Sequence, residues 1–92
     1  PLQAIVASFG LKNLDSILEK RNQNAQHLDK LLSSKDLAEW MLTPVRDERN
    51  YETHSLYMGL FEYRDKLLSY LLENGIEAKI HYPIPIQHLV LI

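Results

Sequence analysis

The sequence has no cysteine, and it has only three glycines and four prolines among its 92 residues. The absence of cysteine excludes disulfides, thiolate metal sites and cysteine nucleophiles. The low glycine and proline content excludes collagen-like and linker compositions. No apolar run approaches the ~20 residues that span a bilayer, and no basic segment precedes an apolar stretch as in a signal peptide. We therefore expect a cytoplasmic protein that does not insert into membranes.

The sequence also has no excess of charge of one sign. Ten Lys and Arg residues stand against 12 Asp and Glu residues, which gives a formal net charge of -2. Such a balance gives little attraction to a phosphate backbone or an anionic lipid surface, so we expect neither nucleic acid nor a membrane as a partner. The four histidines lack the close spacing of metal ligands, and no metal site is predicted.

The composition is that of a folded globular chain. Hydrophobic residues make up 46% and charged residues 24% of the sequence, close to the averages for globular proteins. The length suffices for one small domain and excludes two autonomous domains. The chain opens at Pro1 without a methionine and closes on four aliphatic residues, 89–92. We expect it to be part of a longer protein, because such an apolar end normally continues into packed structure.

Helical periodicity dominates the first third of the chain. Apolar residues at spacings of three and four predict an amphipathic helix over residues 14–32, with Asn13 as its N-cap and Asp15 in its first turn. The nearly all-apolar segment 2–9 predicts a shorter helix that Gly10 ends or bends. A helix of that composition is expected to be buried against another domain or a partner.

The second half of the chain predicts a sheet. Residues 54–61 are apolar on both faces, as in a strand covered on both sides, and residues 77–80 alternate as in a second strand. Between them, residues 64–74 predict a helix that ends at Gly75, followed by the apolar Ile76. This order indicates the α/β class: a two-layer sandwich of strand, helix and strand, with the long helix packed across the sheet.

The most unusual local feature is the segment from His81 to Ile86, in which His81 and Tyr82 precede Pro83 and Pro85. Prolines hold an extended backbone rigid, and loops at strand ends often carry function. An imidazole there can donate to a phosphate oxygen, and a phenol can stack on or hydrogen-bond to a ring. The alternative is a structural role, in which His81 and Tyr82 are half-buried and the prolines only shape a turn.

Several short segments form a distinctive combination through their order and separation: Leu2-Gln3-Ala4-Ile5, Leu14-Asp15, Lys20-Arg21 with Ala25, His54-Ser55-Leu56-Tyr57, Tyr63-Arg64-Asp65-Lys66-Leu67, Asn74-Gly75-Ile76 and His81-Tyr82-Pro83-Ile84-Pro85. With them the chain resembles, over almost its whole length, the carboxyl-terminal part of the DegT/DnrJ/EryC1/StrS sugar aminotransferases. The resemblance implies a fold type I enzyme that depends on pyridoxal 5'-phosphate. Such an enzyme moves an amino group, usually from glutamate, onto the keto group of a nucleotide-linked sugar. It also implies a homodimer with active sites near the subunit boundary.

The resemblance further implies how this chain contributes. Residues 1–12 correspond to the end of the large cofactor-binding domain or a connecting helix, and residues 13–92 to the small C-terminal domain. His81 and Tyr82 fall on the family's His-Tyr pair beside the nucleotide-sugar site, where they place the substrate. The family usually has a histidine soon after the second proline, and the departure at Gln87-His88 leaves these two residues without a role.

The catalytic lysine of the family lies upstream of this region. The lysines of the chain do not match the family's cofactor-lysine motif: Lys12, Lys20, Lys30, Lys35, Lys66 and Lys79. The resemblance therefore predicts that the chain is inactive alone and that the large domain binds the cofactor. The competing interpretation is a small non-catalytic α/β module that binds a ligand such as an amino acid or mediates assembly. A cofactor-lysine motif upstream in the same reading frame would decide between them.

Other polar residues are expected to have structural roles. Arg21 falls within the apolar stripe of the long helix, which predicts a salt bridge or a hydrogen bond at a helix end. His54 and Tyr57 are expected to pack in the core. The mixed charges of residues 46–49 predict a solvated loop.

Overall fold

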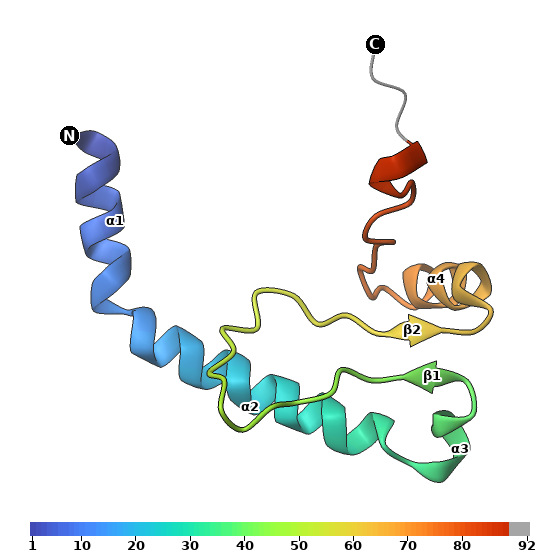
Figure 1. Cartoon of the computed structure of the whole chain (residues 1–92). Coiled ribbons are helices and arrows are strands. Elements are labelled where there is room, and N and C mark those ends of the chain that lie inside the picture. Colours follow the sequence, from blue (N-terminus) through green and yellow to red (C-terminus); the bar gives the residue numbers. More distant parts are fainter. Residues whose placement is uncertain (89–92) are drawn as a thin grey trace. The chain divides into compact units, whose positions relative to one another are not determined.

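The computed structural model describes residues 1–88, so the expectation about the apolar run 89–92 lies outside the described residues. The elements follow in the order α1 (Leu2–Lys12), α2 (Leu14–Leu32), α3 (Lys35–Ala38), β1 (Met41–Leu42), β2 (Leu60–Phe61), α4 (Arg64–Glu73) and the 3-10 helix η1 (Ile86–His88) (Figure 1). Contacts divide the chain into two compact units, residues 1–62 and residues 63–92. The mixture of helices with a small antiparallel sheet is compatible with the α/β class.

The first unit begins with two helices, α1 and α2. The bounds predicted for the long helix are confirmed at both ends. Asn13 occupies the N-cap position of α2, but its amide donates to the carbonyl of Phe9 at 3.4 Å and makes no capping bond. Gly10 neither ends nor bends α1, which continues to Lys12. Glycine permits a left-handed residue but does not force one, so the helix stops only at the polar Asn13.

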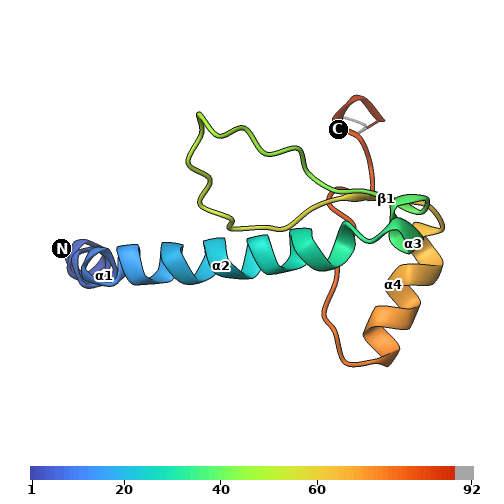
Figure 2. The ribbon, with the colours of Figure 1, turned by 90° about the horizontal axis from the view of Figure 1, so that it is seen from below.

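The sheet of the first unit is small. Met41 pairs with Phe61 and Leu42 with Leu60 in an antiparallel ladder, and the Glu62 amide extends it by donating to the Trp40 carbonyl at 2.8 Å. Residues 43–59 form a long loop that runs along α2 (Figure 2).

The strand predicted over residues 54–61 is correct only for Leu60–Phe61. His54 has a φ of 48°, which lies outside the extended region. Gly59 directly precedes the ladder and has no room for a side chain. A Cβ there would lie 3.0 Å from the Phe61 ring and 3.1 Å from the Leu42 carbonyl oxygen. The apolar pattern therefore identified the segment but not its backbone conformation.

The second unit is organised around α4, whose predicted range and glycine end are confirmed. Gly75 has a φ of 75°, and the amide of Ile76 donates to the Leu71 carbonyl at 2.9 Å while that of Gly75 donates to the Leu72 carbonyl at 3.1 Å. These two bonds form a Schellman motif. Residues 77–80 form no strand within the described structure, so the predicted strand-helix-strand sandwich is not formed there. A strand requires a hydrogen-bonded neighbour, which an alternating pattern does not supply.

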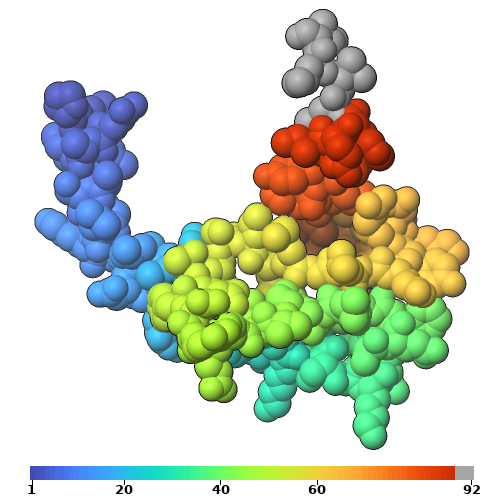
Figure 3. Space-filling view, viewed as in Figure 1, coloured from blue at the N-terminus to red at the C-terminus, as the bar shows by residue number. Residues whose placement is uncertain are grey.

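Burial is concentrated under one face of α2. Ala25, at 4% exposure, is the one buried side chain among residues 1–88. By contrast, the large apolar side chains of α1 are between 66% and 74% exposed: Leu2, Ile5, Val6, Phe9 and Leu11. Figure 3 shows the side chains of α1, in blue, with no other segment over them on that face. The chain therefore exposes a large apolar surface along α1, the helix that the sequence predicts to pack against another domain or a partner. None of the described helices combines the length and the hydropathy that a membrane span requires.

Candidate functional site

The predicted site residues His81 and Tyr82 lie side by side in the second unit, after α4. Their rings stack with centroids 4.0 Å apart and an angle of 30° between the planes. Both side chains are exposed, Tyr82 at 74%. Neither makes a hydrogen bond to another side chain or backbone group within residues 1–88. Among residues 1–88 the pair presents an imidazole and a phenol to solvent, and both the binding role and the structural role stay predictions.

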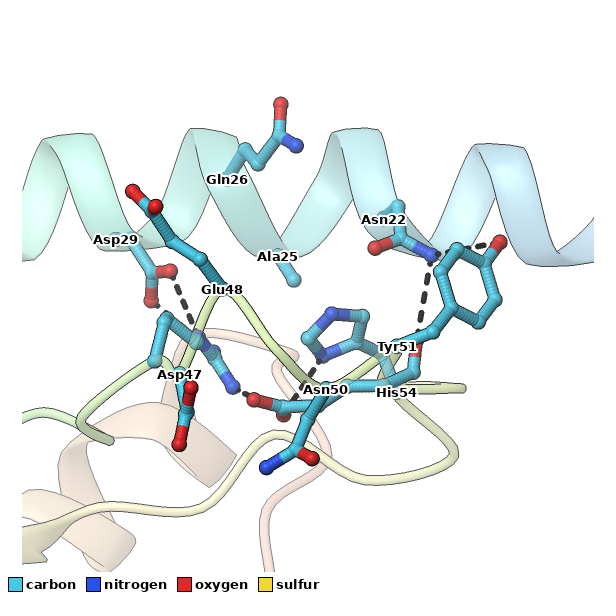
Figure 4. A pocket seen from close by; sticks show the side chains of 11 residues that line it. Asn22, Ala25, Gln26, Asp29, Asp47, Glu48, Asn50, Tyr51 and His54 are labelled. Atoms are coloured by element: carbon cyan, nitrogen blue, oxygen red, sulfur yellow. Dashed lines mark hydrogen bonds and ion pairs between the residues drawn. The ribbon is translucent and has the colours of Figure 1, made fainter.

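A second polar site lies in the first unit, where the long loop meets α2. Arg46 pairs with Asp29 of α2 through two contacts, Nε to Oδ2 at 3.0 Å and Nη2 to Oδ1 at 3.2 Å. Its Nη1 donates to Glu52 Oε2 at 2.6 Å, and the Tyr57 hydroxyl donates to Asp29 Oδ1 at 2.6 Å. We call Asp29, Arg46, Glu52 and Tyr57 the Arg46 cluster. Figure 4 shows how Asp29 of α2 faces the loop in this cluster.

The spacing along α2 explains why the loop is fastened there. Asn22, Ala25 and Asp29 are three and four residues apart and therefore share one helix face. The Asn22 amide donates to its own helix at the Leu18 carbonyl, at 3.0 Å. It also reaches across to the loop, to the carbonyl of Glu52 at 3.3 Å. Asn22 and Asp29 thus hold the loop on either side of the buried Ala25.

Charge and burial shift the pKa values of the Arg46 cluster. The hydrogen bond from Arg46, helped by that from Tyr57, lowers the pKa of Asp29 below its usual value despite partial burial. Burial and the hydrogen bond to Asp29 raise the pKa of Tyr57 to about 12. The hydrogen bond to Asp29 also raises the pKa of Arg46. At neutral pH the cluster therefore contains ionised Asp29 and Arg46 and a neutral Tyr57.

A hollow of about 180 Å³ lies between α2 and the loop, and His54 lines it together with Ala25 and Glu52 (Figure 4). The His54 side chain is only 10% exposed, and its Nδ1 lies 3.7 Å from Glu52 Oε2. The prediction that His54 packs inward is confirmed. Tyr57 is half-buried as well, but its hydroxyl belongs to a polar network, which the prediction of core packing did not include.

One expectation about an arginine is wrong, and another holds only in part. Arg21 is exposed and makes no ion pair with the described side chains, because it lies beside the half-buried stripe of α2 and not within it. The loop segment 46–49 is not uniformly solvated, since the Arg46 side chain is 30% exposed while that of Arg49 is 88% exposed. The residue that needed a partner was Asp29, which shares the stripe with Ala25.

The contacts of the Arg46 cluster fasten the loop to α2. All three nitrogens of the Arg46 guanidinium contact carboxylates, which balance its charge. Within residues 1–88, no three His, Asp or Glu side chains gather in a way that would hold a metal ion.

The described residues also do not fit pyridoxal phosphate. A lysine that carries this cofactor is activated by desolvation or by a neighbouring cation. The side chains of all six lysines are exposed: Lys12, Lys20, Lys30, Lys35, Lys66 and Lys79.

Comparison with known proteins shows which family the chain is similar to. The model of the DegT/DnrJ/EryC1/StrS aminotransferase family matches residues 1–91. A "Pleiotropic regulatory protein" of Geobacillus stearothermophilus is 28% identical over 85 residues, which is 92% of this chain and 23% of that protein. The chain thus spans less than a quarter of the length of the relative that it matches. No solved structure is significantly similar to it.

Proposed function

Because the chain belongs to the DegT/DnrJ/EryC1/StrS aminotransferase family, we propose that it is part of a pyridoxal phosphate-dependent enzyme. That enzyme transfers an amino group from glutamate to the keto group of a nucleotide-linked sugar, and it works as a homodimer in the cytoplasm. The observation that carries this proposal is the family match, which extends over residues 1–91. The role of this chain is to shape the substrate cleft.

The proposal divides the chain at the break between α1 and α2. Residues 1–12 belong with the large cofactor-binding domain or connect to it, and residues 13–92 form the small domain. The apolar surface of α1 supports this division, because a helix that is apolar on all faces is normally buried. Since the lysines of this chain do not fit the cofactor, the proposal places the cofactor and its lysine in the large domain.

His81 and Tyr82 are the residues proposed to contact the nucleotide sugar. Their stacked and exposed rings leave the imidazole nitrogens and the phenol oxygen available to a ligand. An imidazole can donate to a diphosphate oxygen, and a phenol can hydrogen-bond to or stack on the base or the sugar. Pro83 and Pro85 restrict the backbone that follows the pair, which favours a fixed orientation.

Substitution of this pair in the intact protein tests the assignment. His81→Phe and Tyr82→Phe each remove a polar group but keep an aromatic ring. We expect each to raise the KM for the nucleotide sugar or to slow turnover by about tenfold, the usual effect of losing one hydrogen bond to a charged group. The visible absorbance of the bound cofactor should not change. His27→Phe, on the exposed surface of α2, is the matched control. Unchanged kinetics in both variants would remove the pair from the site.

A second candidate function is a non-catalytic α/β module that binds a ligand or mediates assembly. The name of the Geobacillus stearothermophilus relative, "Pleiotropic regulatory protein", favours it. Purification of the intact protein with added pyridoxal phosphate separates the two candidates. An aminotransferase acquires the visible cofactor absorbance and consumes glutamate with a nucleotide-linked keto sugar. A folded protein that does neither supports the non-catalytic module.

A further inference from the structure

The loop 43–59 is long for a segment without regular structure. Loops of more than about 15 residues are uncommon in compact domains, and many of them act as lids or binding loops. Its two ends meet at the ladder between β1 and β2, where Leu42 pairs with Leu60. We call this loop the strap, because its base is fixed and its middle lies along α2 (Figure 2).

The contacts between the strap and α2 are mainly polar. Asp29 contacts Arg46 and Tyr57, and Asn22 contacts the backbone of Glu52. The apolar side chains of the strap contribute little, because they remain exposed: Val45 at 95%, Leu56 at 56% and Met58 at 53%. Burial of apolar area therefore does little to keep the strap in place.

Arg46 is the centre of this attachment. It is the single cation of the Arg46 cluster and lies between two carboxylates, one on α2 and one within the strap. The side chains of Arg46 and Asp29 are each 30% exposed, so solvent and salt reach the pair. Loss of the pairing leaves the Tyr57 hydroxyl bond to Asp29 and the contacts of Asn22 as the remaining hydrogen bonds between α2 and the strap among the described residues.

We propose that the strap is a detachable element, held closed by the ion pair between Asp29 and Arg46, and that it opens as a unit while α1 and α2 stay folded. Opening pivots at the β1–β2 ladder, uncovers Ala25 of α2 and moves His54, which belongs to the strap and lines the hollow from the other side, away from it. The Arg46 cluster has no part in the proposed contact with the nucleotide sugar. The two proposals can therefore fail separately. The strap can open even if His81 and Tyr82 do not bind the substrate, and His81 and Tyr82 can bind the substrate even if the strap does not open.

Trypsin cleavage after Arg49 in the intact protein measures this opening. The Arg49 side chain is exposed, but a protease needs an extended stretch of chain on both sides of the bond, so the rate follows the open population. Asp29→Asn removes the α2 carboxylate of the ion pair with Arg46 and leaves the cleaved sequence unchanged. We expect about tenfold faster cleavage, which corresponds to about 1.4 kcal/mol. Asp15→Asn, an exposed aspartate on the same helix, is the matched control and should cleave like the unaltered protein.

Salt provides an independent arm of the same experiment. Raising NaCl from about 0.1 M to about 1 M shortens the screening length from about 10 Å to about 3 Å. Cleavage of the unaltered protein should rise several-fold relative to a synthetic peptide of residues 45–53, which corrects for the effect of salt on trypsin. Cleavage of Asp29→Asn should rise much less, because its ion pair is already lost.

Two results would overturn the proposal. One is equal cleavage after Arg49 in Asp29→Asn and Asp15→Asn. The other is cleavage of Asp29→Asn at all tryptic sites together with loss of helical circular dichroism, which means global unfolding. Tyr57→Phe is a milder test of the same attachment, since this variant removes only the hydroxyl bond to Asp29. It should speed cleavage by about threefold, and no increase would also overturn the proposal.

Discussion

The first two helices of the chain, α1 and α2, differ in how their side chains are buried. The large apolar side chains of α1 are all exposed, four of them on one face and Leu11 on the other, and its first turn contains no acidic residue. In α2 one stripe is buried or half-buried: Leu18, Asn22, Ala25, Asp29 and Leu32. Two members of that stripe are polar, and the strap satisfies both. The comparison teaches that α2 finds its partner within the first unit through hydrogen bonds and charge. The described residues leave the apolar surface of α1 exposed, in keeping with the proposal that α1 packs against another domain or a partner.

A charge placed on α1 should have the largest effect on the intact protein. If Ile5 is covered there, Ile5→Asp buries an unpaired carboxylate and lowers the free energy of unfolding by about 3 kcal/mol or more. Urea unfolding of the intact protein measures this change. Gln3→Asp is the matched control, since it adds the same charge to the same helix at a position that is already polar. Equal stability of the two variants would mean that α1 is solvated and would remove the contrast with α2.

Loss of the central cation should have the next largest effect, this time on the α2 side of the comparison. Arg46→Met keeps the length of the side chain but leaves Asp29 and Glu52 without their partner, and it should cost about 2 kcal/mol. Arg49→Met removes an arginine of the same loop whose side chain is 88% exposed, so it should change stability by less than about 0.5 kcal/mol. Urea unfolding again provides the measurement. Similar losses from both variants would show that the Arg46 cluster contributes no more than a surface ion pair.

The sequence predicted the elements whose determinants are local. The range of α2 follows from apolar spacing, and the end of α4 follows from Gly75 and the apolar residue after it. The strand expected over residues 54–61 was mostly wrong, because pairing with a distant segment decides where a strand forms. His54 in a left-handed conformation cannot be read from an alternating apolar pattern.

The same distinction explains the candidate sites. His81 and Tyr82 stand out in the sequence because two prolines follow them closely. The Arg46 cluster was missed because Arg46 is 17 residues and Tyr57 is 28 residues from Asp29. One pattern in the sequence does point to it: Asp29 lies four residues after Ala25, within the apolar stripe, and an acid in that position requires a partner. The sequence reasoning assigned this role to Arg21, which lies outside the half-buried stripe.

Acid should weaken the attachment between α2 and the strap, with a moderate effect on stability. Arg46 and Tyr57 contact Asp29 directly, and Glu52 and His54 lie beside them. The pKa of Asp29 is lower in the folded state than in the unfolded state, where it is about 3.9. The contribution of ionised Asp29 to the free energy of unfolding is therefore complete above the unfolded-state pKa and is lost as the pH falls through the folded-state pKa. The free energy of unfolding should therefore decrease less steeply below about pH 4 in Asp29→Asn than in the unaltered protein. Parallel pH profiles would contradict this assignment.

Alkali should act on the same attachment through Tyr57. Its pKa is raised to about 12 in the folded state, against 10.0 for the free side chain. The contribution of Tyr57 is therefore complete below pH 10.0 and is lost as the pH rises toward 12, where the phenolate would face the carboxylate of Asp29. Tyrosinate absorbance of the intact protein should show a late phase that disappears in Tyr57→Phe. Tyr51→Phe, in the same loop, is the control. Loss of the late phase in Tyr51→Phe, and not in Tyr57→Phe, would contradict the prediction.

The smallest effects concern two glycines, and they return to the surface of α1. Gly75 has a φ of 75° at the end of α4, so Gly75→Ala should cost about 1 kcal/mol. Gly10 lies inside α1, and a Cβ there would meet no described atom within 4 Å. Because alanine is more favourable than glycine inside a helix, Gly10→Ala should raise the free energy of unfolding of the intact protein by up to about 1 kcal/mol. A loss at Gly10 would contradict this expectation and would locate the partner of α1 directly against that position, since only close packing penalises one added methyl group.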